Sequence, residues 1–310
     1  MEMDNKKNSY LDIQVNGYAG VDFNQNKITC ESMEFACNKL VEDNVEGIFA
    51  TIITADLEDM IIRIKQLVQL RNQSSLIRKI IKGIHMEGPF INATPGYHGA
   101  HPIDAILKPD VKIMKELLDA GDGLVRVVTL APEKDDQNKV TRFLASQNIT
   151  VSAGHCNPSM DELKSAIDAG LSMFTHLGNG CPQDLPRHDN IIQRALSFKD
   201  DLQICFIADG IHIPFYALKN YISIAGIENV IITTDSMAAA GAKEGRFTLS
   251  NMELEVGKDR IVREPGKSNF AGSAIDMKSS FSNLTKHLGL SVEDAKQMTY
   301  FNPLKIFNKK

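Results

Sequence analysis

The segment 80–90 reads IIKGIHMEGPF. Its apolar first half is typical of a buried strand, and His85 and Glu87 follow at the carboxyl end before a Gly-Pro pair. Two further apolar runs end in the same way, at His155 and at His176. Barrel enzymes carry their chemistry at the carboxyl ends of parallel strands, so this pattern is the main indication of the fold class.

Eight apolar, β-rich runs are predicted as strands, and the segments between them have helical periodicity. The predicted strands are 11–15, 47–53, 80–85, 124–130, 149–153, 171–175, 203–208 and 230–234. This alternation predicts a (β/α)8 TIM-type barrel, and a doubly wound open sheet is the alternative. Polar residues at the strand ends, Asp209 and Asp235 among them, favour the barrel because a barrel brings them to one mouth.

The segment 246–263 alternates like a β-hairpin, with its turn predicted at Gly257. We expect it to be an excursion after the eighth strand, ahead of closing helices at 274–288 and 291–300. No stretch rich in Pro, Gly or Ser divides the chain. Residues 1–310 are therefore predicted to form a single domain.

The composition excludes several classes of protein. Hydrophobic residues make up 43% of the 310 residues and charged residues 24%, which excludes a disordered chain. The net charge of −5, without basic clusters, argues against a nucleic-acid partner. No apolar run approaches the roughly 20 residues of a membrane span. Five cysteines without a CxxC pair, and no signal-peptide pattern, predict a cytoplasmic protein.

Glu87, His155 and His176 offer one carboxylate and two imidazoles from different predicted strand ends. This set suits one divalent ion, with Zn²⁺ as first choice and Fe²⁺ or Mn²⁺ as alternatives. Asp235 ends the eighth predicted strand, and a carboxylate beside a metal can take a proton from water and return it to a leaving group. Each residue alone could be a polar group satisfied at the barrel rim. Their convergence favours a hydrolytic metal site.

Nine short motifs occur in order along residues 11–303: DIQVNG (12–17), GVDF (20–23), HMEGPF (85–90), GAH (99–101), GH (154–155), THL (175–177), ADGIH (208–212), TDSM (234–237) and AGS (271–273). Together they resemble the N-acetylglucosamine-6-phosphate deacetylases, a branch of the amidohydrolases. The resemblance implies a hydrolase of linear amide C–N bonds in amino-sugar catabolism. Its reaction would convert N-acetyl-D-glucosamine 6-phosphate to D-glucosamine 6-phosphate and acetate.

The resemblance also implies roles for single residues. Glu87, His155 and His176 match the metal ligands, Asp235 matches the acid/base, and His101 matches a group that helps to polarise the acetyl carbonyl. Gln14 and Asn16 stand where many amidohydrolases carry His-x-His, which predicts one metal ion rather than two. The residues matched to substrate contacts are Ala100, His101, Asn179, Gly180, Arg187, Asp209, His212, Phe270, Ala271 and Gly272.

The chain departs from the family pattern in two places. The family usually has an aromatic residue after Thr-His-Leu and then Asn-Ala-Met, whereas this chain reads GNGC at 178–181. Arg187 falls where the family places an arginine for the 6-phosphate, often across a dimer interface, so a homodimer is expected. The family's small β-sandwich is built from segments outside the barrel, and we expect a barrel without it.

Two alternative functions remain open. The altered 178–190 loop motivates an amidohydrolase for a different N-acyl amino sugar, including an unphosphorylated one. The other alternative is a sugar-phosphate binder without catalysis, and the intact set of Glu87, His155, His176 and Asp235 argues against it.

Overall fold

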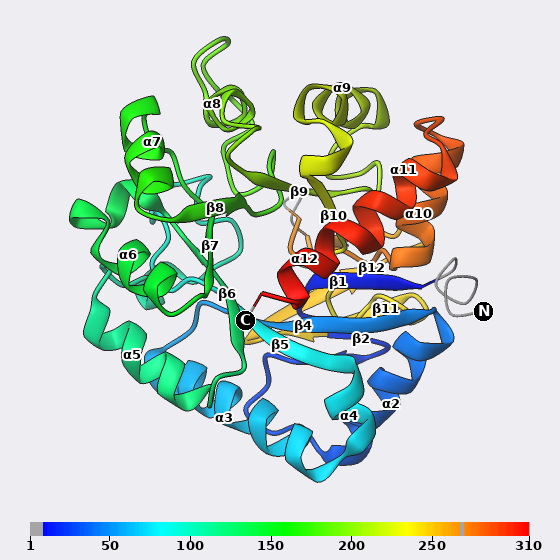
Figure 1. Cartoon of the computed structure of the whole chain (residues 1–310). Coiled ribbons are helices and arrows are strands. Elements are labelled where there is room, and N and C mark those ends of the chain that lie inside the picture. Colours follow the sequence, from blue (N-terminus) through cyan, green and yellow to red (C-terminus); the bar gives the residue numbers. More distant parts are fainter. Residues whose placement is uncertain (1–8, 267–269, 310) are drawn as a thin grey trace.

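The computed structural model describes residues 9–266 and 270–309, and eight parallel strands form its centre. The strands follow one another around the sheet in sequence order (Figure 1). They are β1 (Tyr10–Val15), β4 (Val45–Ile53), β5 (Ile81–Glu87), β6 (Val125–Leu130), β7 (Thr150–Ala153), β8 (Leu171–Phe174), β9 (Gln203–Ile207) and β10 (Val230–Thr233). The predicted barrel and all eight predicted strands are confirmed.

The barrel closes between β1 and β10. A single parallel bridge pairs Val15 with Ser236. Below it, the buried carboxylate of Asp12 accepts hydrogen bonds from the hydroxyls of Thr233 and Thr234, both at 2.6 Å. Burial raises the pKa of Asp12 to about 6, although these hydrogen bonds oppose the shift. Side-chain contacts therefore join the first and last strands where regular pairing is short.

Helices surround the barrel on its outside (Figure 1). Their apolar faces pack against the outward side chains of the strands in the main hydrophobic cluster. They are α2 (Cys30–Glu42), α3 (Leu57–Gln73), α4 (Ser75–Ile80), α5 (Val111–Ala120), α6 (Lys139–Ser146), α7 (Met160–Asp168), α8 (Ile191–Ser197), α9 (Phe215–Ala225), α10 (Met277–Lys286) and α11 (Val292–Lys296), and a last helix, α12 (Asn302–Phe307), lies elsewhere. A capping box formed by Ser159 and Glu162 opens α7.

The last helix, α12, covers one end of the barrel interior. Ile306 packs with the inward residues of the strands, and Phe307 stacks on Phe49 with ring centroids 4.2 Å apart. Phe49 and its cluster partners lie within the strands, before the carboxyl ends that carry the polar residues. The helix α12 therefore covers the end of the barrel away from those residues.

The excursion after β10 is a three-stranded antiparallel sheet of β11 (Gly245–Leu249), β12 (Met252–Val256) and β13 (Val262–Arg263). The prediction of a hairpin at 246–263 is confirmed, and so is the turn at Gly257, where the Arg260 amide donates to the Gly257 carbonyl at 3.0 Å between β12 and β13. A second turn, which the sequence did not predict, joins β11 to β12 at residues 250–251, where Ser250 has a left-handed φ of +56°. Asp22 accepts a hydrogen bond from the Ser250 amide at 2.8 Å, and the buried Arg63 donates to the Ser250 hydroxyl at 3.0 Å.

None of the helices within residues 9–266 and 270–309 combines the length and apolarity of a membrane span. All five cysteines are free.

The attachment of α12 generates a stability prediction. Asn302 is fully buried and donates from Nδ2 to the carbonyl oxygens of Ile227 and Val230, both at 2.7 Å. Asn302→Ala removes both donors, and we expect it to lower the free energy of unfolding by about 2–3 kcal/mol in urea titrations. The exposed Asn308→Ala on the same segment is the control, with a change below about 0.5 kcal/mol. Equal stability of the two variants would contradict this assignment.

Candidate active site

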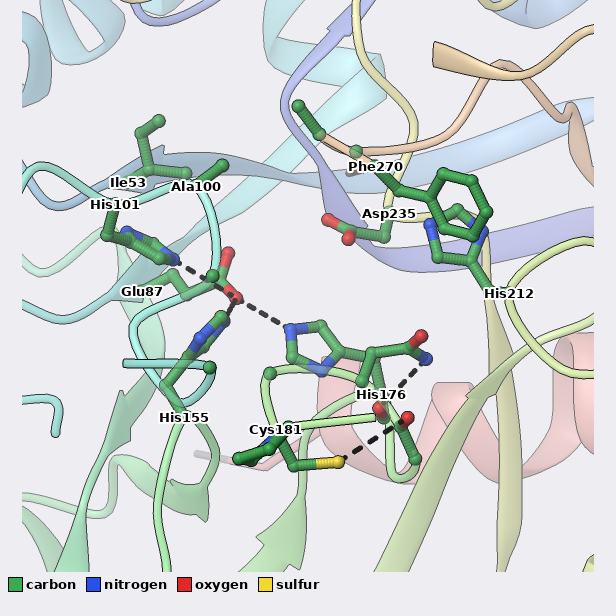
Figure 2. Close-up of a pocket in the computed structure, with 18 of the residues that line it drawn as sticks. Ile53, Glu87, Ala100, His101, His155, His176, Cys181, His212, Asp235 and Phe270 are labelled. Atoms are coloured by element: carbon green, nitrogen blue, oxygen red, sulfur yellow. Dashed lines mark hydrogen bonds and ion pairs between the residues drawn. The ribbon is translucent and has the colours of Figure 1, made fainter. Parts of the chain in front are cut away.

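The carboxyl ends of the barrel strands open into a cavity of about 550 Å³. It contains Glu87 from β5 together with residues that directly follow β7, β8 and β10. Figure 2 shows His155 and His176 directed at Glu87, with Asp235 across the cavity. The lining residues are Asn16, Ile53, Glu87, Gly96, Gly99, Ala100, His101, His155, His176, Gly178, Asn179, Gly180, Cys181, Pro182, Gln183, Leu185, Ile192, His212, Asp235, Leu249, Phe270, Ala271 and Gly272.

Three of these lining residues have a left-handed backbone conformation, which is unfavourable for residues other than glycine. His155, His176 and Asp235 have φ angles of +51°, +31° and +49°. Non-glycine residues rarely adopt such angles, and each costs on the order of 1–3 kcal/mol that the surrounding fold must offset. All three residues share this unfavourable backbone conformation, which indicates that the surrounding fold stabilises it in order to orient these side chains.

One oxygen of Glu87 is the meeting point of the cluster. Oε1 lies 3.0 Å from His155 Nε2, 2.9 Å from His176 Nε2 and 3.9 Å from His101 Nε2. The other oxygen, Oε2, accepts a hydrogen bond from Gln14 Nε2 at 3.2 Å. Burial opposes ionisation of Glu87, but the hydrogen bonds from His155 and His176 outweigh it and hold its pKa well below the usual range.

The His155 ring is fixed on its far side. Its Nδ1 donates to the Tyr97 carbonyl at 2.8 Å, so Nε2 is the nitrogen that faces the cavity. Gly180 lies against the ring, because a Cβ there would stand 2.8 Å from Nδ1. The unusual Gly-Asn-Gly-Cys loop therefore packs directly on one member of the cluster.

These residues fit a divalent metal ion. Ligand atoms of Glu87, His155 and His176 all lie within 4.8 Å of one another, and all three residues are buried. The donor set is one ionised carboxylate and two imidazoles, which is typical of catalytic zinc and related ions. Tyr97 orients one ligand and Gln14 another, as the neighbours of metal ligands commonly do. The cluster that the sequence predicted is assembled.

Asp235 faces the cluster from the opposite wall. Its Oδ1 accepts a hydrogen bond from Asn16 Nδ2 at 2.8 Å. Burial, and then repulsion from the Glu87 charge, raise the pKa of Asp235 to about 7. A carboxyl group near this value can both accept and release a proton at neutral pH.

His101 comes from the loop that follows β5. Burial lowers its pKa to about 3, so the ring is neutral and carries one N–H. Its Nδ1 is buried without a hydrogen-bond partner in the described structure. A neutral imidazole at this place can donate to an oxygen of a bound molecule.

The predicted substrate contacts divide into three groups. Eight line the cavity, namely Ala100, His101, Asn179, Gly180, His212, Phe270, Ala271 and Gly272. Asp209 does not line it but holds His212, whose Nδ1 lies 2.6 Å from Asp209 Oδ2. Arg187 is exposed on the loop after β8 and does not line the cavity of this single chain.

Sequence reasoning missed the roles of Gln14 and Asn16. It considered them only as poor metal ligands, whereas the structure has them donating to Glu87 and Asp235, the two carboxylates of the site. Their spacing is the available signal, because residues two apart in an extended segment face the same side.

No protein-family profile matches the chain. Among curated proteins it is similar to N-acetylglucosamine-6-phosphate deacetylase from Bacillus subtilis, with 29% identity over 97% of this chain and 75% of the relative. It is also similar to N-acetylgalactosamine-6-phosphate deacetylase from Escherichia coli O157:H7, with 27% identity over 96% of this chain and 77% of the relative.

Solved structures agree with these similarities. A variant of N-acetyl-D-glucosamine-6-phosphate deacetylase from Mycobacterium smegmatis, in complex with N-acetyl-D-glucosamine-6-phosphate, superimposes with a TM-score of 0.86. It is 28% identical and is matched over 96% of this chain and 77% of its own. The Thermotoga maritima enzyme has a TM-score of 0.83 at 25% identity, over 96% of this chain and 78% of its own.

The barrel, the cluster and these similarities together support the amidohydrolase family for this chain. Within that family, its predicted resemblance to the N-acetylglucosamine-6-phosphate deacetylases is confirmed over nearly the whole chain.

The cluster generates a prediction for metal content. We expect purified protein to hold one divalent ion per chain by inductively coupled plasma mass spectrometry. Glu87→Gln should lose most of it, because the amide lacks the charge that draws the ion. Glu133→Gln, at another carboxylate shielded by the fold but outside the cluster, should retain it. Two tightly bound ions per chain, or full metal content in Glu87→Gln, would refute a single site built on Glu87.

Proposed function

We propose that this chain hydrolyses the acetamide of N-acetyl-D-glucosamine 6-phosphate, releasing acetate and D-glucosamine 6-phosphate. One observation carries the proposal: Asp235, with a pKa near neutrality, faces the Glu87, His155 and His176 cluster across the cavity. The deacetylases with which it aligns along nearly its whole length support the choice of substrate. One Zn²⁺ per chain and a cytoplasmic homodimer belong to the same proposal.

Glu87, His155 and His176 would hold the ion. A divalent ion bound there supplies Lewis-acid polarisation of the acyl carbonyl and makes water more acidic. Asp235 accepts a proton from the attacking water while the oxygen of that water bonds to the acyl carbon. The C–N bond then breaks, and Asp235 returns the proton to the departing nitrogen. One carboxyl group thus serves as base and then as acid, which its pKa near neutrality permits.

His101 has a separate role in this scheme. Its neutral ring lies at the same end of the cavity as Glu87, with Nε2 3.9 Å from Glu87 Oε1. We assign its N–H as a donor to the acyl oxygen, where negative charge develops as water attacks. All residues of this mechanism lie on the barrel strands or their loops, so the mechanism requires no residue of a β-sandwich.

The sugar end is assigned to the opposite part of the cavity. His212 and Phe270 lie against each other there, with ring centroids 5.2 Å apart (Figure 2). Asp209 accepts hydrogen bonds from the His212 amide at 2.9 Å and from its ring at 2.6 Å, which fixes the imidazole. Arg187 is proposed to bind the 6-phosphate of a substrate held by the neighbouring subunit, which agrees with its exposure in the single chain.

A second candidate is an amidohydrolase for another N-acyl amino sugar. The loop at 178–181 favours it, because Gly178 stands where the family usually has an aromatic ring, and a Cβ there would lie only 3.3 Å from Ile213. An N-acetylgalactosamine-6-phosphate deacetylase among the similar proteins points the same way. A panel of N-acetyl hexosamines, with and without 6-phosphate, separates these substrates and would also reveal a binder without turnover.

Asp235→Asn tests the proton transfer. The amide keeps the shape of the side chain but cannot accept a proton at neutral pH, so we expect turnover to fall by about 10²–10⁴-fold. Metal content should be unchanged, since Asp235 is not in the ligand cluster. Near-normal turnover in the metal-loaded variant would remove Asp235 from the mechanism.

Arg187→Ala tests the phosphate assignment. Loss of a charge-assisted contact should reduce kcat/KM for the 6-phosphate by about 2–4 kcal/mol equivalents. Slow turnover of unphosphorylated N-acetylglucosamine should barely change. The exposed Arg142→Ala on α6 is the control. Equal effects on the two sugars, or none on either, would withdraw the phosphate contact and leave the deacetylase assignment standing.

A further inference from the structure

Asn16 follows β1 and lines the cavity beside Asp235. Its Nδ2 donates to Asp235 Oδ1 at 2.8 Å. In the form that acts as base, Asp235 is ionised and only accepts hydrogen bonds, so the end of the Asn16 amide that faces it is the nitrogen. The other end, Oδ1, is buried and has no hydrogen-bond partner in the described structure.

The backbone fixes both partners of this contact. The Asn16 amide donates to the Ser236 carbonyl at 2.7 Å, and the Asn16 carbonyl accepts from the Phe23 amide at 2.9 Å. The Asp235 carbonyl accepts from the Ser273 amide at 3.0 Å. Asn16 and Asp235 are therefore held side by side before any ligand enters, as a precise binding geometry requires.

An unpaired buried carbonyl is costly, at about 1–3 kcal/mol. This cost is offset when a bound molecule donates a hydrogen bond to the oxygen. A molecule in the cavity is the candidate donor, because Asn16 lines the cavity wall. The donor must lie next to Asp235, since Asn16 bonds to that carboxylate. Under the proposed reaction, the atom next to Asp235 is the nitrogen of the scissile amide.

The geometry points to Asn16 Oδ1 as the acceptor for the N–H of the scissile amide. The assignment rests on the proposed function and deepens it. A secondary amide nitrogen carries one hydrogen. When that hydrogen is bound by Asn16, the nitrogen lone pair that develops after water attack faces Asp235, from which it takes the proton as the C–N bond breaks. Asn16 is thus a positioning residue that selects secondary amides over acyl groups without an N–H.

Two substrates that differ only at this atom test the assignment. N-acetylglucosamine 6-phosphate carries the N–H, and 2-O-acetylglucose 6-phosphate has an ester oxygen in its place. Asn16→Leu has nearly the same size but neither donates nor accepts. Misplacement of Asp235 slows both substrates, whereas loss of the Oδ1 acceptor slows the amide alone. We therefore expect the ratio of kcat/KM for amide over ester to fall by about tenfold or more.

Asn92→Leu is the matched control. Asn92 is also buried and donates from Nδ2 to a carboxylate, Glu133 Oε1, at 2.8 Å, but it does not line the cavity. Its replacement should leave the amide-to-ester ratio unchanged. Metal content and melting temperature, measured for both variants, identify any general damage to the fold.

The outcomes separate the two proposals. Wild-type protein that hydrolyses no N-acetyl amino sugar overturns the proposed function, and the Asn16 assignment with it. Active wild-type protein with the same amide-to-ester ratio in Asn16→Leu overturns the Asn16 assignment alone. Should the ester not react, a crystal structure of Asp235→Asn with the amide bound decides the question. Asn16 Oδ1 within about 3.2 Å of the substrate nitrogen supports the assignment, and no such contact refutes it.

Discussion

The site depends on a negative charge kept inside the protein. Glu87 is 3% exposed, and an unpaired carboxylate at such a place would be strongly destabilising. His155 and His176 converge on one of its oxygens and Gln14 donates to the other. The contacts that keep Glu87 ionised also place two imidazoles beside it, so that all three groups can bind the same cation. Stabilisation of the charge and preparation of the metal site are therefore one arrangement.

Much of the surrounding structure serves this arrangement. The left-handed backbone of His155 and His176 turns their rings toward Glu87. Gly99 and Gly180 approach the His155 ring so closely that a Cβ at either would stand within about 3.0 Å of it. The charge of Glu87 also acts across the cavity, where it raises the pKa of Asp235 after burial has done so. The proposed base thus has its pKa set in part by the metal ligand that it faces.

The sequence predicts the barrel and the metal cluster because both follow from local signals. A parallel strand has its carboxyl end at the barrel mouth, so a polar residue that ends an apolar run can be placed without knowing the rest of the fold. The turn between β11 and β12 could not be placed in this way. Gly257 is a local turn signal and the chain turns there, whereas the turn at Ser250 is bound by Asp22 and Arg63, which are both distant in sequence. The contacts of Gln14 and Asn16 likewise exist only after the strands meet.

Arg187 marks the limit of such reasoning within one chain, because family spacing predicts a phosphate contact while the fold leaves the side chain exposed. The central claim concerns the other end of the substrate, where water is added to the acyl carbon. The most direct measurement is hydrolysis of N-acetylglucosamine 6-phosphate in ¹⁸O-labelled water, with mass analysis of both products. The account predicts one labelled oxygen in acetate, and no label in glucosamine 6-phosphate beyond the anomeric oxygen, which exchanges with water without the enzyme. Absence of acetate, or acetate without label, would contradict it.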